Sequence, residues 1–114
     1  MRKMTDTEDF EIKCMELIAN SGEAKSLYIE AIRLARQGDF KKAKELWDSA
    51  GKTYQNAHNV HFDMFQMEVG VESNLQRMFL IHAEDQLSGA ETFKLVSEEI
   101  IELYRKLYNS SSND

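Results

Sequence analysis

The feature that most constrains the fold is a run of evenly spaced positions in the last third of the chain, between Leu75 and Leu107. Read at alternating steps of four and three, the run is Leu75, Phe79, His82, Gln86, Gly89, Phe93, Val96, Ile100, Leu103 and Leu107. We call these positions the C-terminal seam. Such heptad spacing is typical of a long helix that packs against other helices. The chain is therefore predicted to be all-α.

A second heptad seam comes earlier in the chain. Its positions are Phe40, Ala43, Trp47, Ala50, Tyr54, Ala57, His61 and Met64. The small residues among them would let neighbouring helices approach closely. A further apolar stripe from Phe10 to Ala35 predicts a first helix, which a capping box of Thr5 and Glu8 would begin. The stripe resumes in phase after Asn20-Ser21-Gly22, which favours a kink over a break.

The helix ends follow from a few residues. Gly38 is expected to end the first helix in a left-handed conformation, and Asp39 to cap the second. Residues 67–74, with Gly70 inside, form the expected connection to a third helix capped by Ser73 or Asn74. Short connections make consecutive helices antiparallel neighbours. We expect one domain over residues 1–108, an antiparallel three-helix bundle, followed by a disordered polar tail over 109–114.

Composition narrows the class of function. The 114 residues include no Pro, five Gly and a single Cys, and carry a net charge of -6. An acidic chain without a basic stripe argues against binding nucleic acid. There is no apolar run of about 18 residues that could span a bilayer, and the first residues do not resemble a signal peptide. The lone Cys14 fits a reducing cytoplasm.

Two polar residues, His82 and Gln86, stand in the C-terminal seam where Leu or Ile is expected, and Asp85 lies one helical turn from His82. Polar groups in a packed seam cost free energy unless they are satisfied. One interpretation is that they fix the register and the choice of partner. The other is that His82 is a nucleophile and Asp85 sets the charge or holds a cation. Histidine suits this role because an unperturbed imidazole, with a pKa of about 6.5, is largely neutral at neutral pH.

The antiparallel arrangement should bring His58 and His61 to the level of His82 and Asp85. With Glu84 these residues could form a ligand set for a metal-dependent hydrolase. However, the sequence has no His-Glu-x-x-His or Glu-x-x-His spacing, and it has no glycine-rich phosphate loop. A reactive histidine on a small acidic helical domain points instead to a carrier of phosphoryl groups.

The sequence resembles the enzyme IIA component of the lactose/cellobiose (N,N'-diacetylchitobiose) group of the bacterial sugar phosphotransferase system. Three stretches carry the resemblance within residues 12–107: Asn20-Ser21-Gly22-Glu23-Ala24-Lys25-Ser26, Ala35-Arg36-Gln37-Gly38-Asp39-Phe40 with Ala57-His58, and His82-Ala83-Glu84-Asp85-Gln86-Leu87. The last is similar to the family's His-Ala-Gln-Asp-His-Leu.

The resemblance implies a cytoplasmic phosphotransferase component with a spectrin-repeat-like three-helix protomer that forms a homotrimer. His82 would accept phosphate from the histidine-containing phosphocarrier protein and pass it to the cysteine of IIB, which acts with the membrane component IIC in importing a disaccharide. Asp85 would hold a divalent cation, Mg²⁺, on the trimer axis. The alternative is a non-catalytic helical trimer that regulates or binds other proteins.

Three positions depart from the family's pattern. Glu84 replaces Gln beside the histidine, Gln86 replaces the second His of the motif, and His61 stands where Gln is usual. Together with His58, these residues are candidates for supporting the site from its surroundings. If Glu84 pointed toward His82, its charge would oppose a dianionic phosphoryl group.

Overall fold

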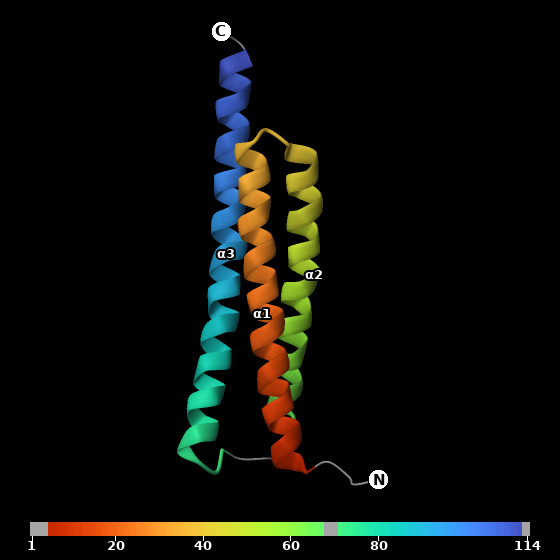
Figure 1. Ribbon diagram of the computed structural model, residues 1–114, viewed down its shortest axis with the longest axis vertical. Helices are drawn as coiled ribbons and strands as arrows, with labels where there is room; N and C mark the ends of the chain where they lie inside the picture. The colour runs from red at the N-terminus through yellow and green to blue at the C-terminus, as the bar shows by residue number, and fades with distance from the viewer. Residues whose placement is uncertain (1–4, 68–70, 113–114) are drawn as a thin grey trace.

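The chain forms three long helices in the computed structural model, which describes residues 5–67 and 71–112. They are α1 (Asp6–Arg36), α2 (Phe40–Phe65) and α3 (Asn74–Ser112). Together they make a rod of 66 × 29 × 18 Å, in which α2 runs antiparallel to both α1 and α3 (Figure 1). The prediction of an all-α three-helix protomer is thus confirmed for the described residues.

Side chains begin each helix as the sequence predicts. The Thr5 hydroxyl accepts a hydrogen bond from the Glu8 N–H at 3.1 Å, and the Glu8 carboxylate accepts one from the Thr5 N–H at 3.2 Å, which completes the capping box. The Asp39 carboxylate accepts from a backbone N–H in the first turn of α2. The Ser73 hydroxyl accepts from a backbone N–H of α3 at 3.1 Å, so Ser73 is the capping residue there. Each cap satisfies a donor that the helix leaves unpaired.

The segment Asn20-Ser21-Gly22 lies inside one uninterrupted helix. The Asn20 amide donates to the Glu16 carbonyl at 2.9 Å, and Ser21 is buried. The prediction of one helix rather than two is confirmed. Gly70, expected in the connection between α2 and α3, lies outside the described residues.

The turn between α1 and α2 is closed by the end of α3. Gly38 has a φ of 87°, as predicted for a left-handed residue after a helix. The Tyr108 hydroxyl donates to the Arg36 carbonyl at 2.9 Å, and its ring meets the edge of Phe40 with centroids 5.4 Å apart. α3 continues beyond this contact to Ser112, so the helix does not end at the predicted domain boundary. No Gly or Pro follows Tyr108 to stop it.

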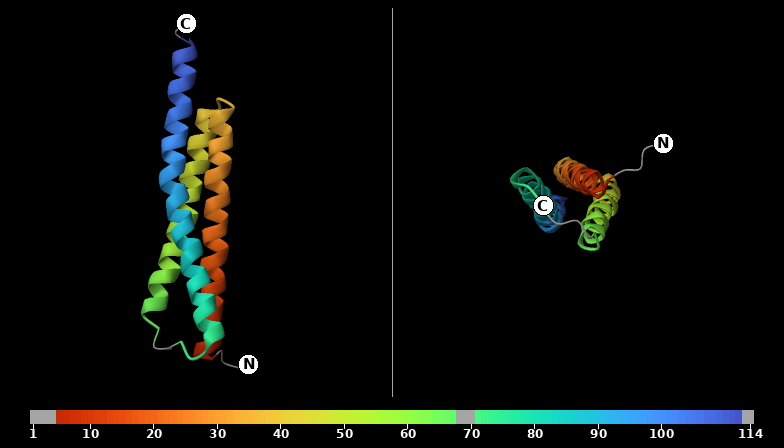
Figure 2. Two further views of the ribbon diagram at one scale, coloured as in Figure 1. Left: turned by 90° about the vertical axis from the view of Figure 1, so that its left-hand side faces the viewer. Right: turned by 90° about the horizontal axis from the view of Figure 1, so that it is seen from below.

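α1 forms the centre of the bundle. It contacts both α2 and α3 extensively, whereas α2 and α3 contact each other much less (Figure 2). Small residues line these contacts: Ala24, Ala31 and Ala35 of α1, Ala43, Ala50 and Ala57 of α2, and Ala83, Ala90 and Ser97 of α3 are fully buried. Larger side chains, including Leu17 and Tyr28, fill the space between them.

The C-terminal seam lies at the edge of the core: Phe79 and Phe93 pack against it, whereas other seam positions face outward. The buried positions of α3 are Gln76, Ala83, Leu87, Ala90, Ser97 and Ile101, and each lies one residue after a seam position. In the seam itself, Leu75 is 77% exposed and Leu103 is 58% exposed. One residue rotates the helix surface by about 100°, so several larger apolar side chains of α3, among them Leu75, Leu103 and Leu107, point outward. Close approach to α1 and α2 selects the stripe of small residues instead.

None of the helices in the described part of the chain is both long enough and apolar enough to cross a membrane.

The Gly38 turn can be tested by substitution. We expect Gly38→Ala to lower the free energy of unfolding by about 1–2 kcal/mol, because alanine disfavours positive φ. Its Cβ would also lie 2.7 Å from the Tyr108 ring. Gly22→Ala is the matched control: a Cβ there meets nothing within 4 Å, and alanine should stabilise the helix by about 0.5–1 kcal/mol. Urea unfolding followed by circular dichroism measures both. Equal effects at the two sites would contradict this account of the turn.

Candidate functional site

His82 and Asp85 lie on the exposed side of α3, one helical turn apart. Residues three apart on a helix are neighbours on its surface. Among the described residues, neither side chain forms a hydrogen bond or an ion pair. The imidazole of His82 is therefore accessible on a rigid element, and its surroundings within the protomer leave its nitrogens unengaged.

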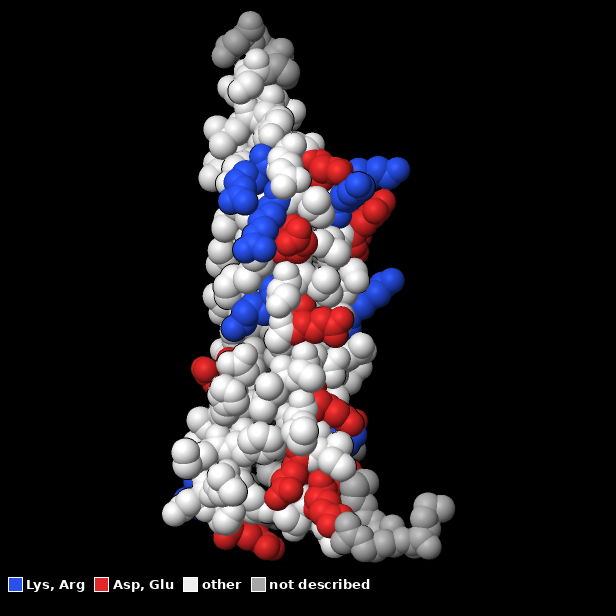
Figure 3. Space-filling view, in the orientation of Figure 1, with Lys and Arg blue, Asp and Glu red and all other residues white. Residues whose placement is uncertain are grey.

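Exposed apolar side chains lie beside His82 on α3. Met78 is 68% exposed and Ile81 is 60% exposed. Figure 3 shows one face of the molecule. Most lysine and arginine side chains on this face lie in its upper half, and most charged side chains in its lower half are acidic. His82 belongs to the N-terminal part of α3, which lies in the lower half of the rod (Figure 1).

Glu84 points to α2 rather than toward His82. Its Oε2 lies 2.9 Å from Nε2 of His61, which joins the two helices. The His61 ring also meets the edge of Phe65, with centroids 4.8 Å apart. His61 is thus at the level of the predicted site, as the antiparallel arrangement required. The sequence singled out both residues separately but did not predict that they pair.

A small cavity of about 220 Å³ lies beside the His61–Glu84 pair. It is lined by Phe10, His61, Met64, Phe65, Val71, Leu80 and Glu84. Most of these side chains are apolar, so the cavity offers few groups that could orient a polar ligand. We assign it no ligand.

Cys14 of α1 lies in the hydrophobic core of the bundle, where it is fully buried. Burial raises the pKa of its thiol to about 11, and the negative charges of Glu11 and Glu84 add to this effect.

The structure does not bring His58 and Gln86 into a cluster with His82. His58 is exposed, and its ring lies 6.3 Å from that of Tyr54 on its own helix. Gln86 is partly buried in α3. Over residues 5–67 and 71–112, no hydrogen bond or ion pair joins either residue to His82 or Asp85. Their supporting role therefore stays a prediction.

No group of three His, Cys, Asp or Glu side chains within the described part of one protomer is placed to hold a metal ion. Asp85 supplies a carboxylate, which is the type of ligand that Mg²⁺ prefers, but a single carboxylate does not make a site. A cation at Asp85 would need further ligands from outside this group of side chains.

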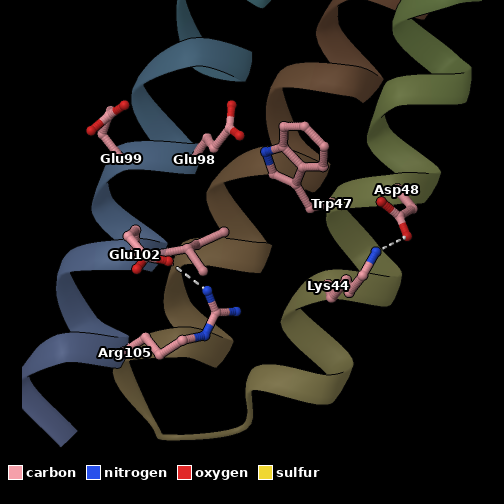
Figure 4. A pocket seen from close by; sticks show the side chains of 8 residues that line it. Lys44, Trp47, Asp48, Glu98, Glu99, Glu102 and Arg105 are labelled. Carbon is pink, nitrogen blue, oxygen red and sulfur yellow. Dashed lines mark hydrogen bonds and ion pairs between the residues drawn. The ribbon is translucent and has the colours of Figure 1, made fainter. Parts of the chain in front are cut away.

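Besides the small cavity, a groove lies between the upper halves of α2 and α3 (Figure 4). The sequence did not reveal this groove. Its volume is about 420 Å³, and its lining is Lys44, Trp47, Asp48, Glu98, Glu99, Ile101, Glu102 and Arg105. Ion pairs along its sides, Lys44 with Asp48 at 3.0 Å and Arg105 with Glu102 at 2.7 Å, each stay within one helix. The Trp47 Nε1–H donates to the buried Ser97 hydroxyl at 2.9 Å. Ser97 follows Ala83 and Ala90 at heptad spacing, which is a sequence signal for the burial of this serine but not for its hydrogen bond to Trp47.

Comparison with known proteins identifies the family of the chain. Residues 12–105 match the family described as PTS system, Lactose/Cellobiose specific IIA subunit. The chain is 35% identical over 103 residues to the PTS system N,N'-diacetylchitobiose-specific EIIA component of Escherichia coli strain K12, covering 90% of this chain and 89% of that protein. It is 33% identical over 100 residues to the lichenan-specific phosphotransferase enzyme IIA component of Bacillus subtilis strain 168, covering 88% and 91%.

A more distant relative is the PTS system lactose-specific EIIA component of Staphylococcus epidermidis, 28% identical over 99 residues, which cover 87% of this chain and 95% of that protein. No solved structure gives a significant match to the chain. The family match and these identities define the class of protein, a component of a sugar phosphotransferase system. The chain belongs to its lactose/cellobiose-specific IIA family.

The raised pKa of Cys14 predicts slow alkylation. At pH 8, we expect iodoacetamide to modify the folded protein at least about 100-fold more slowly than the urea-unfolded chain, because a pKa of about 11 instead of 9.0 lowers the thiolate fraction about 100-fold. The same shift should weaken folding as pH rises from 9 toward 11, since the unfolded chain loses the thiol proton first. Mass spectrometry measures the modification. Comparable rates in both states would show that the thiol is accessible.

Proposed function

We propose that this chain is the phosphocarrier of a sugar phosphotransferase system and that His82 is the residue phosphorylated. The observation that carries the proposal is the exposed imidazole of His82 on a rigid helix, within the region that matches the family. The phosphoryl donor would be the histidine-containing phosphocarrier protein, and the acceptor the cysteine of the cognate IIB component.

The chemistry needs an accessible nitrogen and little else from this protomer. The lone pair of an imidazole nitrogen of His82 forms a bond to phosphorus while the nitrogen–phosphorus bond in the donor's phosphohistidine breaks. In the second transfer, the bond at His82 breaks as the thiolate of IIB forms a sulfur–phosphorus bond. Both steps exchange one nucleophile for another and need no oxidant. The Glu84 carboxylate pairs with His61 and would therefore not face a phosphoryl group on His82.

Docking of the partners would use the lower end of the rod. Exposed Met78 and Ile81 flank His82 and can enter an apolar partner surface. Acidic residues outnumber basic ones among the described residues of the lower half of the rod. They include Asp6, Asp9, Glu11, Asp63, Glu84 and Asp85. Opposite charges on the partner would steer association. A basic face on the phosphocarrier protein and on IIB would therefore be complementary.

The exposed C-terminal seam supports a homotrimer. Leu75, Val96, Leu103 and Leu107 form an outward stripe along α3, and contiguous exposed apolar surface marks an interface. His82 and Asp85 lie on the same side of the helix as this stripe. Three copies packed through α3 would bring three Asp85 carboxylates together, and Mg²⁺ would remove their mutual repulsion. The protein would act in the cytoplasm, where the buried thiol of Cys14 stays reduced.

The transported sugar would be a disaccharide of the cellobiose, chitobiose or lactose type. This proposal rests on the sugars that the names of the related IIA components contain, N,N'-diacetylchitobiose and lactose among them. The sugar would meet IIB and the membrane component IIC rather than this chain.

Substitution of His82 tests the carrier role. We expect His82→Ala to take up no phosphate and to keep its stability within about 0.5 kcal/mol, because the wild-type side chain is exposed. The measurement is intact mass under non-acidic conditions after incubation with phosphoenolpyruvate, enzyme I and the phosphocarrier protein. His58→Ala, which alters another exposed imidazole, should accept one acid-labile phosphate as the wild type does. Absence of phosphate on the folded wild type would favour the non-catalytic regulatory trimer.

Substitution of Asp85 tests the axial cation. We expect the wild type to sediment as a trimer with Mg²⁺ and to dissociate more readily in EDTA, because chelation exposes the repulsion between carboxylates. Asp85→Leu should remain a trimer in both conditions, since apolar packing replaces the charges. Analytical ultracentrifugation over a range of concentrations measures the association. Monomeric Asp85→Leu, or a wild type insensitive to EDTA, would contradict the cation proposal.

A further inference from the structure

The His61–Glu84 hydrogen bond is one of two side-chain hydrogen bonds that join α2 to α3 in the described part of the chain. The other joins Trp47 to Ser97 in the upper half. His61 is the better fixed partner of the lower pair, since its side chain is 19% exposed against 44% for Glu84. The edge contact with Phe65 holds the ring further. Because an ionised carboxylate only accepts, His61 donates through its Nε2–H.

Glu84 and His82 are separated by two residues on α3, which rotates their side chains by about 200° around the helix axis. Residues spaced in this way do not face each other. Helix geometry therefore places Glu84 on a different flank of α3 from His82, and the hydrogen bond to His61 holds the carboxylate there. Without that bond, the flexible side chain would be free to turn across the exposed surface toward Asp85.

The negative charge near His82 depends on where the Glu84 carboxylate lies. Asp85 already places one negative charge a helical turn from His82. Over residues 5–67 and 71–112, no lysine or arginine forms an ion pair with Glu84 or Asp85. A freed Glu84 would add a second negative charge beside a residue that must receive a dianionic phosphoryl group, where like charges repel.

We propose that His61 is a positioning residue that restrains the carboxylate of Glu84 away from His82 and so keeps the surface around His82 receptive to phosphate. This inference rests on the proposed phosphorylation of His82. It assigns His61 a role through Glu84, without contact with the phosphoryl group. The inference also gives Glu84 and His61, two of the three departures from the family's pattern, a common explanation. A glutamate at position 84 would require a hydrogen-bond donor such as His61 to hold its carboxylate.

Four variants test the inference. His61→Leu removes the donor but fits the apolar surroundings, and His61→Gln keeps an N–H donor for the carboxylate. Glu84→Gln removes the charge, and the double variant His61→Leu/Glu84→Gln removes both. Trp47→Phe is the matched control, because it deletes the other hydrogen bond between α2 and α3. Each protein is first checked for folding by thermal unfolding.

The rate of phosphorylation at His82 is measured in two ways at low ionic strength. The enzymatic assay uses phosphoenolpyruvate, enzyme I and the phosphocarrier protein. The chemical assay uses phosphoramidate, in which an imidazole nitrogen bonds to phosphorus while the phosphorus–nitrogen bond of the reagent breaks and ammonia leaves. Mass spectrometry of peptides locates the phosphate. The chemical assay reads the surroundings of His82 without any protein partner.

We expect His61→Leu to slow the phosphorylation of His82 by about three- to tenfold in both assays, as repulsion by one added charge predicts. His61→Gln, Glu84→Gln, the double variant and Trp47→Phe should stay within about twofold of the wild type. The deficit of His61→Leu should shrink in about 1 M salt, which screens exposed charges. Recovery of the rate in the double variant is the decisive result, because it lacks the hydrogen bond just as His61→Leu does and differs from His61→Leu only in the charge at position 84.

Two results would overturn the inference. One is a wild-type rate for His61→Leu in both assays. The other is an equal loss in His61→Leu and in the double variant, which would make the pair a structural link only, whether or not Glu84→Gln keeps a hydrogen bond through its amide oxygen. The proposed function fails separately, if the wild type reacts with phosphoramidate but takes no phosphate from the phosphocarrier protein. In that case the chemical assay still decides the role of His61.

Discussion

The close contact of α1 with its two neighbours is the constraint on which the other features depend. Fully buried alanines on all three helices, such as Ala31, Ala50 and Ala90, allow the backbones to approach closely. Since α2 and α3 contact each other much less, α1 sets the position of both. The only side-chain hydrogen bonds between α2 and α3 in the described chain are then added to a geometry that α1 has already fixed.

This choice of contact surface determines what α3 presents outside the bundle. Because the small residues turn inward, Leu75, Val96, Leu103 and Leu107 of the C-terminal seam remain exposed together with His82 and Asp85. One helix therefore presents two surfaces, an inner stripe that packs within the bundle and an outer stripe that is exposed. The proposed chemistry and the proposed trimer share the outer stripe, so assembly and phosphoryl transfer would be physically connected.

The surroundings of His82 arise from interactions on the other flank of α3. Glu84 is bound by His61, and its charge contributes to the high pKa of the buried Cys14. Glu84, two residues from the proposed nucleophile, therefore interacts with α2 although its side chain is partly exposed. An acidic residue in this motif is compatible with a phosphorylated histidine because the fold directs it elsewhere.

The sequence by itself determined the helices, their caps, the left-handed Gly38 and the inward face of α2, since these depend on local hydrogen bonds and on periodicity. It also singled out His82, Asp85, His61 and Glu84 as residues of interest. Only the tertiary structure decided which stripe of α3 is buried, because two stripes one residue apart have the same period and only the distance between backbones selects the small one. It likewise decided that Glu84 meets His61, since a pair 23 residues apart forms only when two helices are brought side by side.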